Sequence, residues 1–317
     1  MIPDGLELYP IRVPLRMRFR RVEHRDAVLI KGPCGWGEFS PFDEYPLDVA
    51  GRWLAAAVEL ACREMPTQRR EVIPVNVTVP AVGPDVAHSM VGASGATTAK
   101  VKIGDHSRSE AEDLARVKAV REALGPHGHI RVDVNAAWSV ETAARRLEGL
   151  AAYGIQYVEQ PVATIEEMVE LRSKTPIPLA ADELVRQSSD PLEVVEQGGA
   201  DVLILKVQPM GGVAAVLDLA ARSTVPVVIS SALETSIGMY GGLAAAAALP
   251  ALDFACGLGT VSLMADDPTP EPLVPQNGLL KVRRPEPSDD LLERLKPPDS
   301  VSDQMLDRLS AAAEFLV

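Results

Sequence analysis

The segment Val202-Leu203-Ile204-Leu205-Lys206 consists of four apolar residues followed by a charge. A short apolar run of this kind is typical of a parallel strand that is buried on both faces. Runs of similar character recur along the chain, with helix signals between them. They lie at residues 73–79, 99–103, 130–134, 156–159, 177–180, 225–229 and 252–256.

The spacing of these eight runs predicts the fold. From the second run onward they end near residues 102, 133, 159, 182, 206, 230 and 256, which leaves room for one helix between neighbours. We therefore predict parallel βα units over residues 72–284 that close into a TIM-type barrel. An open doubly wound sheet is the alternative, but it would carry a glycine fingerprint after its first strand, and the sequence has none there.

Residues 1–71 follow a different pattern and predict a small α+β unit. Loose alternation over residues 6–18 and an extended run at 27–30 predict two strands joined by a turn, and residues 48–65 predict a helix. The segment 285–317 is rich in proline and charge, and we expect it to pack back onto this unit.

Composition excludes several classes of function. The chain has 317 residues, 47% of them hydrophobic, and a net charge of −13. An acidic surface repels phosphate backbones and anionic lipid, so we expect neither nucleic-acid nor membrane partners. The longest apolar stretch, residues 237–252, is too short to cross a bilayer and predicts a buried helix.

The cysteines and the N-terminal residues suggest a cellular location. No signal-peptide pattern is visible at the start of the sequence. Cys34, Cys62 and Cys256 are widely spaced and form no CxxC pair, so we expect neither a disulfide framework nor a zinc site. A reducing cytoplasm fits this pattern best.

Charged residues interrupt the apolar runs where the predicted strands end. In chain order they are Lys100 and Lys102, Asp133, Glu159, Asp182 and Lys206. The C-terminal ends of barrel strands carry the chemistry in this architecture, so we predict that these side chains converge there.

Three converging carboxylates repel one another unless a cation lies among them. Oxygen ligands without a nearby histidine or cysteine select a hard ion, so we predict Mg²⁺, with Mn²⁺ as the alternative. Glu183 is an alternative ligand to its neighbour Asp182. Lys102 and Lys206, on the flanking strands, are then placed for proton transfer, and the like charge of Lys100 would lower the pKa of Lys102.

A non-catalytic interpretation also accounts for single residues of this set. The chain would then be a barrel used as a binding protein, with its carboxylates salt-bridged to Lys100, Lys102 and Lys206. The joint pattern of six charges at five consecutive strand ends favours chemistry instead.

Five motifs in order resemble the enolase superfamily, and more narrowly its muconate-lactonizing subgroup. They are Lys100-Val101-Lys102, Asp133-Val134-Asn135, Glu159-Gln160-Pro161, Ala181-Asp182-Glu183 and Lys206. The resemblance covers almost the whole chain. It implies a (β/α)7β barrel over residues 72–284 and an α+β capping domain, residues 1–71, completed by residues 285–317.

The resemblance also implies roles for individual residues. Asp133, Glu159 and Asp182 would bind Mg²⁺, while Lys102 and Lys206 would face each other across the substrate. Supporting or substrate-binding positions would be Lys100, Arg131, Asn135, Ser230 and Gly257.

The activity implied by the resemblance is removal of a proton alpha to a carboxylate. The subgroup member most like this chain is a hydro-lyase of menaquinone biosynthesis that dehydrates 2-succinyl-6-hydroxy-2,4-cyclohexadiene-1-carboxylate to 2-succinylbenzoate. An N-succinylamino-acid racemase or related epimerase on the same scaffold is the alternative. A dipeptide epimerase would carry Asp-x-Asp on the last barrel strand, where residues 253–259 here read Asp-Phe-Ala-Cys-Gly-Leu-Gly. The partner is in each case a small carboxylate, and the chain is either a monomer or a homo-oligomer.

Overall fold

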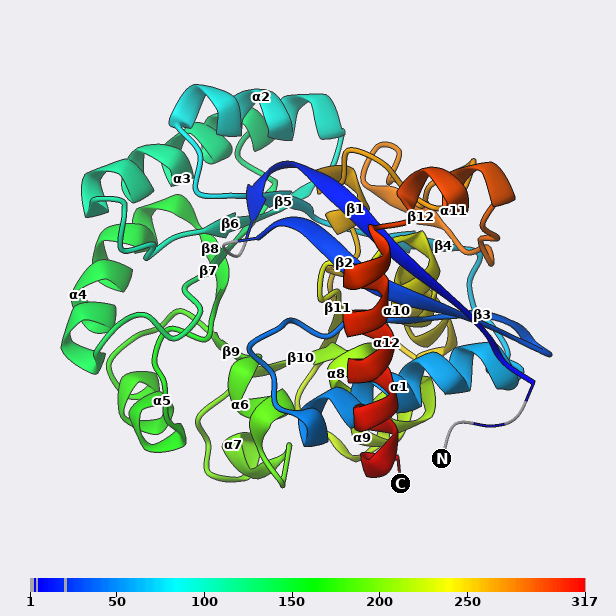
Figure 1. Cartoon of the computed structure of the whole chain (residues 1–317). Helices are drawn as coiled ribbons and strands as arrows, with labels where there is room; N and C mark the ends of the chain where they lie inside the picture. The colour runs from blue at the N-terminus through cyan, green and yellow to red at the C-terminus, as the bar shows by residue number, and fades with distance from the viewer. Residues whose placement is uncertain (1–2, 4, 20–21, 317) are drawn as a thin grey trace.

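Seven of the predicted barrel strands form one parallel sheet, hydrogen-bonded in chain order. The structure is a computed structural model that describes residues 3, 5–19 and 22–316. The strands are β5 (Val77–Val79), β6 (Thr98–Lys102), β7 (His129–Asp133), β8 (Ile155–Glu159), β9 (Leu179–Ala181), β10 (Val202–Lys206) and β11 (Val227–Ser230). The sheet curls into a barrel, and helices α2 to α5 cover its outer face in Figure 1.

At least one helix follows each of these strands. They are α2 (Pro84–Ser94), α3 (Glu110–Leu124), α4 (Val140–Leu150), α5 (Ile165–Arg172), α6 (Glu183–Gln187), α7 (Glu193–Glu196), α8 (Val207–Met210), α9 (Val213–Arg222) and α10 (Ser236–Ala248), with 3₁₀ turns η1 (Ala151–Tyr153) and η2 (Thr260–Leu263). Capping boxes begin two of them: Ser109 bonds Glu112 in α3, and Thr164 bonds Glu167 in α5. Such caps satisfy the free N–H groups of a first turn, so they fix where these helices start. None of the described helices is long and apolar enough to span a membrane.

The eighth barrel strand, predicted at residues 252–256, is shorter than expected. Only Cys256 and Gly257 pair, as isolated parallel bridges to Val75 and Ser230. Backbone bonds still close the barrel on both sides, from Cys256 N to the Pro74 oxygen (2.7 Å) and from Gly257 N to the Ile229 oxygen (2.8 Å). Residues 252–255, which precede them, form no strand pairing.

Side-chain contacts occupy those preceding residues. The carbonyl of Ala255 accepts a bond from Arg131, and Phe254 packs edge-on against Tyr157 with ring centroids 5.9 Å apart. These contacts hold residues 254 and 255 outside the strand ladder, and the pairing begins only at Cys256. The architecture is therefore a (β/α)7β barrel, with a very short last strand.

The predicted first strand, residues 73–79, is divided between two sheets. β4 (Val72–Pro74) pairs antiparallel with β12 (Leu279–Lys281), and β5 joins the barrel sheet, although the Pro74 oxygen and Val75 also pair with Cys256 of the eighth strand. Proline lacks an N–H to donate to a ladder, so a break at Pro74 follows from the covalent chemistry.

The N-terminal unit has three strands rather than the two expected. β1 (Glu7–Phe19), β2 (Val22–Gly32) and β3 (Gly35–Phe39) form an antiparallel sheet, and α1 (Leu47–Cys62) packs on it. The third strand was missed because its Gly-Trp-Gly start gives little strand signal. We call this unit the cap.

The C-terminal segment returns to the cap. It contains α11 (Asp289–Leu295), α12 (Asp299–Ala312) and η3 (Ala313–Phe315). α12 contacts α1 and β2, beside which it lies in Figure 1. Leu309 and Leu292 join Trp53 in one buried cluster, so this contact is apolar and belongs to the core of the cap.

The interior contains separate clusters with different contents. Apolar side chains fill the barrel around Tyr157, Ile204 and Val228, while Leu233 and Ile237 of the barrel belong to the core of the cap. The cap and the barrel therefore share apolar contacts around the segment between β11 and α10.

Gly37 provides a test of how closely the cap packs. A Cβ at this position would lie 1.9 Å from the backbone oxygen of Ala57 in α1. We expect Gly37→Ala to reduce the free energy of unfolding by about 1–3 kcal/mol, the usual cost of overpacking, measured by urea denaturation. Gly92→Ala is the matched control, because Gly92 lies in α2 with no atom near its would-be Cβ. That control should be neutral or stabilising by up to about 1 kcal/mol, and equal stabilities for both variants would contradict the packing argument.

Candidate active site

The predicted charged residues converge at one end of the barrel. Lys102, Asp133 and Glu159 lie side by side on adjacent strands, because the register pairs Lys102 with Asp133 and Asp133 with Glu159. Asp182 follows β9 directly, and Lys206 ends β10. Parallel strands place their carboxyl ends at the same edge, so the register alone brings these side chains together.

Ion pairs join the lysines to the carboxylates. Lys100 Nζ lies 2.8 Å from Asp133 Oδ2 and 2.5 Å from Glu159 Oε1. Lys102 donates to Asp133, and Lys206 donates to Asp182. All three carboxylates are about 1% exposed, so each loses its hydration and depends on these partners.

Burial and neighbouring charge shift the pKa values in this cluster. Burial raises the pKa of Glu159, and the charge of Asp133 raises it further, to about 7. Burial alone would raise the pKa of Asp133, but Lys100 and Lys102 hold it well below its usual range. Burial lowers the pKa of Lys102, and Lys100 lowers it further, in spite of the attraction to Asp133.

Lys100 is affected differently from Lys102. Burial would lower its pKa, but Asp133 and Glu159 together raise it well above the ordinary value. Lys100 is therefore the cation that neutralises this part of the cluster, and Lys102 is the lysine whose charged form is less favoured.

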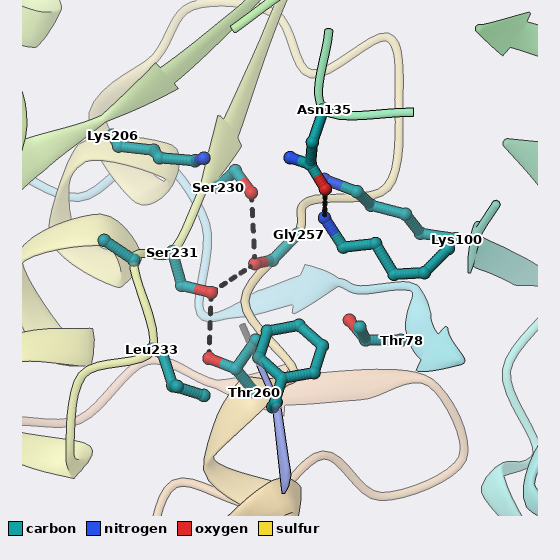
Figure 2. Close-up of a pocket in the computed structure, with 12 residues that line it drawn as sticks. Thr78, Lys100, Asn135, Lys206, Ser230, Ser231, Leu233, Gly257 and Thr260 are labelled. Atoms are coloured by element: carbon teal, nitrogen blue, oxygen red, sulfur yellow. Dashed lines mark hydrogen bonds between the residues drawn. The ribbon is translucent and has the colours of Figure 1, made fainter. Parts of the chain in front are cut away.

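A cavity that is partly open to solvent lies at this end of the barrel. Six of the predicted residues line it, namely Lys100, Lys102, Asn135, Lys206, Ser230 and Gly257. Figure 2 shows Lys206 pointing toward Asn135, whose side-chain oxygen accepts a bond from Lys102 Nζ (2.7 Å). The two lysines predicted to transfer protons therefore line the same cavity, and Asn135 is in contact with one of them.

Sequence reasoning missed half of the lining. The remaining residues are Phe19, Thr78, Ser231, Ala232, Leu233 and Thr260. Ser231 and Thr260 share a hydrogen bond of 2.8 Å (Figure 2), which forms a polar patch beside Leu233. Phe19 comes from the cap, and its ring centroid is 5.9 Å from Lys102 Nζ. No local sequence signal indicates that the end of a cap strand reaches the barrel.

Arg131 does not line the cavity. Its guanidinium donates to Gln156 Oε1 (2.7 Å), to the Ala255 oxygen (2.6 Å) and, more weakly, to Asn76 Oδ1 (3.4 Å). The side chain is about 1% exposed and lies against Tyr157. These contacts tie β7 and β8 to the short eighth strand, and a role in substrate binding stays a prediction.

Asp182 and Glu183 differ in their surroundings. Asp182 faces Lys206, whereas Glu183 accepts bonds from Asn135 (3.2 Å) and Arg186 (2.9 Å). Burial would raise the pKa of Asp182, but Lys206 and Arg186 hold it well below its usual range. The side chain of Asp182 makes no capping bond to α6, so helix capping does not account for an aspartate here.

The three carboxylates fit a hard divalent cation in their chemistry. All their donor atoms are oxygens, and Oδ1 of Asp182 is buried without accepting a hydrogen bond, although Arg186 Nε is 3.3 Å away. Within the described ranges, no three histidine, cysteine, aspartate or glutamate side chains are already arranged around a common point as metal ligands. The lysines instead hold the carboxylates, and the ligand assignment of Asp133, Glu159 and Asp182 stays a prediction.

Two family models match the chain. A model described as Enolase C-terminal domain-like matches residues 84–287, and one described as Enolase N-terminal domain-like matches residues 11–61. The first covers most of the barrel and the second covers most of the cap.

Curated relatives match over nearly the whole length. An o-succinylbenzoate synthase of Thermobifida fusca (strain YX) is 50% identical over 284 residues, 90% of each chain. An o-succinylbenzoate synthase of Mycobacterium bovis (strain BCG / Pasteur 1173P2) is 46% identical over 312 residues, 98% of this chain and 94% of the relative. Among solved structures, muconate lactonizing enzyme from Pseudomonas fluorescens, complexed with muconolactone, superposes with a TM-score of 0.79. It shares 22% identity, covering 93% of this chain and 99% of its own, which shows the fold alone.

Proposed function

The chain belongs to the enolase superfamily and is an enzyme, and from this premise we propose that it is an o-succinylbenzoate synthase. The reaction is the dehydration of 2-succinyl-6-hydroxy-2,4-cyclohexadiene-1-carboxylate to 2-succinylbenzoate, a step of menaquinone biosynthesis. The observation that carries the proposal is a single cavity lined by Lys102 and Lys206 at the barrel end that holds three buried carboxylates, in a chain 46–50% identical to o-succinylbenzoate synthases.

Members of this superfamily usually need a divalent metal ion, and we propose Mg²⁺, with Mn²⁺ as the alternative. Asp133, Glu159 and Asp182 would hold it. When bound, such an ion neutralises the substrate carboxylate and the negative charge that develops on it, which is worth several kcal/mol in a buried site.

Lys102 is the proposed acid and base. Its neutral amine takes the proton from the carbon alpha to the carboxylate, and an enediolate forms. The ammonium so produced then donates that proton to the 6-hydroxyl, the C–O bond breaks, and water leaves with the ring aromatic. Asn135 and Asp133 hold the Lys102 side chain through its Nζ, which limits its motion between the two steps.

Lys206 has an electrostatic role in this proposal. It lines the cavity on a strand four places along the sheet from that of Lys102, and its Nζ donates to Asp182. A fixed ammonium in a desolvated cavity stabilises the enediolate without the cost of reorienting solvent. Ser230 and Gly257, which line the cavity, are the proposed contacts for the remainder of the substrate.

Racemisation of an N-succinylamino acid would use the same two lysines, one removing the proton and the other returning it. The cavity geometry fits both reactions, and the relatives at 46–50% identity favour dehydration. The strand-end carboxylates are salt-bridged, as the non-catalytic interpretation requires, but the family assignment makes the chain an enzyme.

We further propose a small carboxylate as the substrate partner and the cytoplasm as the location. Cys34, Cys62 and Cys256 are free thiols, the state that a reducing compartment maintains. The oligomeric state is open between monomer and homo-oligomer.

The direct test of function is loss of the cyclohexadiene absorbance on addition of the protein. We expect turnover with Mg²⁺ and none after EDTA, restored when excess Mg²⁺ is returned. A folded, metal-binding protein without turnover would contradict the synthase assignment. N-succinylamino acids would then be tested by loss of optical activity.

The role of Lys102 is tested by Lys102→Ala. We expect kcat to fall roughly 10²- to 10⁴-fold, the usual contribution of general acid–base catalysis, with the fold retained, because Asp133 keeps its ion pair with Lys100. Lys118→Ala is the matched control, because Lys118 is an exposed lysine of α3 whose ion pair within the described part of the chain is with Glu122. Lys102→Ala with more than a tenth of the normal turnover would remove Lys102 from the mechanism.

Metal affinity separates Asp182 from Glu183. We expect Asp182→Asn to weaken Mg²⁺ binding by about tenfold or more, equivalent to about 1.4 kcal/mol, in isothermal titration. Glu183→Gln should bind Mg²⁺ nearly as the unmodified protein does, because its carboxylate faces Asn135 and Arg186. The opposite result would make Glu183 the ligand.

A further inference from the structure

A buried carboxylate of the cap reaches into the barrel. Glu38 lies at the end of β3 and is about 1% exposed. Its oxygens accept four hydrogen bonds: from Ser40 Oγ (2.7 Å), Thr235 N (3.3 Å), Thr235 Oγ1 and Gly238 N (2.9 Å). Three of these donors belong to the barrel, so Glu38 binds across the boundary between the two units.

Its barrel partners are the first residues of α10. Thr235 is the N-cap of that helix, and α10 has no acidic residue of its own in the first turn. The first N–H groups of a helix lack intrahelical partners and favour a nearby negative charge. Asp267 of the barrel accepts from Ser236 N (2.9 Å), and Glu38 adds a second carboxylate, supplied by the cap, at Thr235 and Gly238.

The segment before α10 forms one wall of the cavity. Ser231, Ala232 and Leu233 line it, on the side where Figure 2 shows Leu233 beside the Ser231–Thr260 hydrogen bond. Leu233 has φ +67°, a left-handed conformation that residues other than glycine seldom adopt. Such a conformation is strained and persists only where its surroundings impose it.

Two side chains of the cap, Arg25 and Glu38, form hydrogen bonds with the segment before α10. Arg25 of β2 donates from Nε to the Leu233 oxygen (3.1 Å) and also donates to the Ser40 oxygen. Two residues after Leu233, the backbone N–H and the hydroxyl of Thr235 donate to Glu38. Leu233 and Ile237 are packed in the core of the cap. The bonds and the packing act on the same stretch, residues 231–238.

We propose that Glu38 is a positioning residue that fixes residues 231–233 as the cavity wall and so sets how tightly the substrate binds. This rests on the proposed function, since the wall faces the cavity in which Lys102 and Lys206 act. Glu38 lies outside that cavity and acts through Thr235 and the first turn of α10. The proton-transfer lysines are held by other strands, so loss of Glu38 affects substrate binding more than the chemical step.

Glutamine at position 38 is the sharpest probe. Every partner of the Glu38 carboxylate donates a hydrogen bond, and the N–H groups of Thr235 and Gly238 lie on different oxygens. Either orientation of an amide would place its NH₂ against one of these N–H groups. Glu38→Gln therefore keeps the size of the side chain and loses its hold on the helix start.

The chain provides a matched control. Glu59 of α1 accepts bonds from Val213 N and Ala214 N (3.0 Å) at the first turn of α9, which also has no acidic residue there. This is the same chemistry between cap and barrel, but neither Val213 nor Ala214 lines the cavity. Glu59→Gln thus removes an equivalent contact without touching the wall.

The experiment measures kinetics and hydrogen exchange on the full chain. For Glu38→Gln we expect KM for the cyclohexadiene carboxylate to rise about tenfold with kcat within about threefold, the signature of lost ground-state binding. Amide exchange should accelerate over residues 231–238. For Glu59→Gln we expect unchanged KM and kcat, with faster exchange confined to the start of α9.

Every other outcome contradicts or supports either the role of Glu38 or the proposed function. Normal KM in Glu38→Gln, or an equal rise in Glu59→Gln, would overturn the positioning role. An unmodified protein without turnover would refute the proposed function instead, and exchange over residues 231–238 would still test Glu38: unchanged exchange overturns its role and faster exchange supports it. Should Glu38→Gln fail to fold, Arg25→Lys, which keeps the charge but loses the Nε bond to Leu233, is expected to show the same pattern to a smaller extent.

Discussion

Charge neutralisation inside the barrel is the constraint on which the site depends. Three carboxylates at the ends of β7, β8 and β9 are removed from water, and Lys100, Lys102 and Lys206 are the cations that compensate them. A buried charge that loses its partner is strongly destabilising, so neither set could be kept without the other. In the proposed mechanism, a divalent ion would take over these carboxylates from the lysines. The same cluster thus holds the proposed metal ligands and the proposed proton-transfer groups in one buried site.

Closure of the barrel depends on side-chain contacts below the cavity as well as on backbone pairing. The eighth strand pairs at only two residues, and Arg131, Tyr157 and Phe254 supply contacts across that gap. These contacts account for the burial of Arg131, which the sequence analysis assigned to a supporting or substrate-binding position. Arg131 shares a strand face with Asp133, but two residues of a strand are roughly 7 Å apart, so the same face reaches both the cavity and the interior below it.

The parts that followed from sequence are those with local causes. A short apolar run ending in a charge, repeated at the interval of one strand and one helix, is enough to predict parallel pairing and hence the convergence of Lys102, Asp133 and Lys206. The missed residues have long-range causes. Phe19 enters the cavity from a cap strand, and Leu233 adopts a left-handed conformation that its own sequence disfavours. Nothing near either residue in the chain encodes the contact that places it. The division of residues 73–79 between two sheets was only partly predictable. Pro74 predicts a break in the strand, but nothing in the local sequence indicates that β4 pairs with β12.

The proposed proton transfer and the proposed substrate binding depend on different parts of the fold. The lysines and carboxylates sit on barrel strands whose register is fixed by a ladder of backbone bonds, so their geometry depends little on the cap. In the wall at residues 231–233, Ser231 N donates to the Gly257 oxygen of the barrel (3.1 Å), whereas the Leu233 oxygen accepts from Arg25 of the cap and the following Thr235 is bound by Glu38. Under the proposed mechanism, changes in the cap are therefore expected to alter substrate binding with little effect on proton transfer. A barrel with a fixed set of acids and bases and a wall shaped by a second unit is suited to serve several substrates by changes in the cap alone.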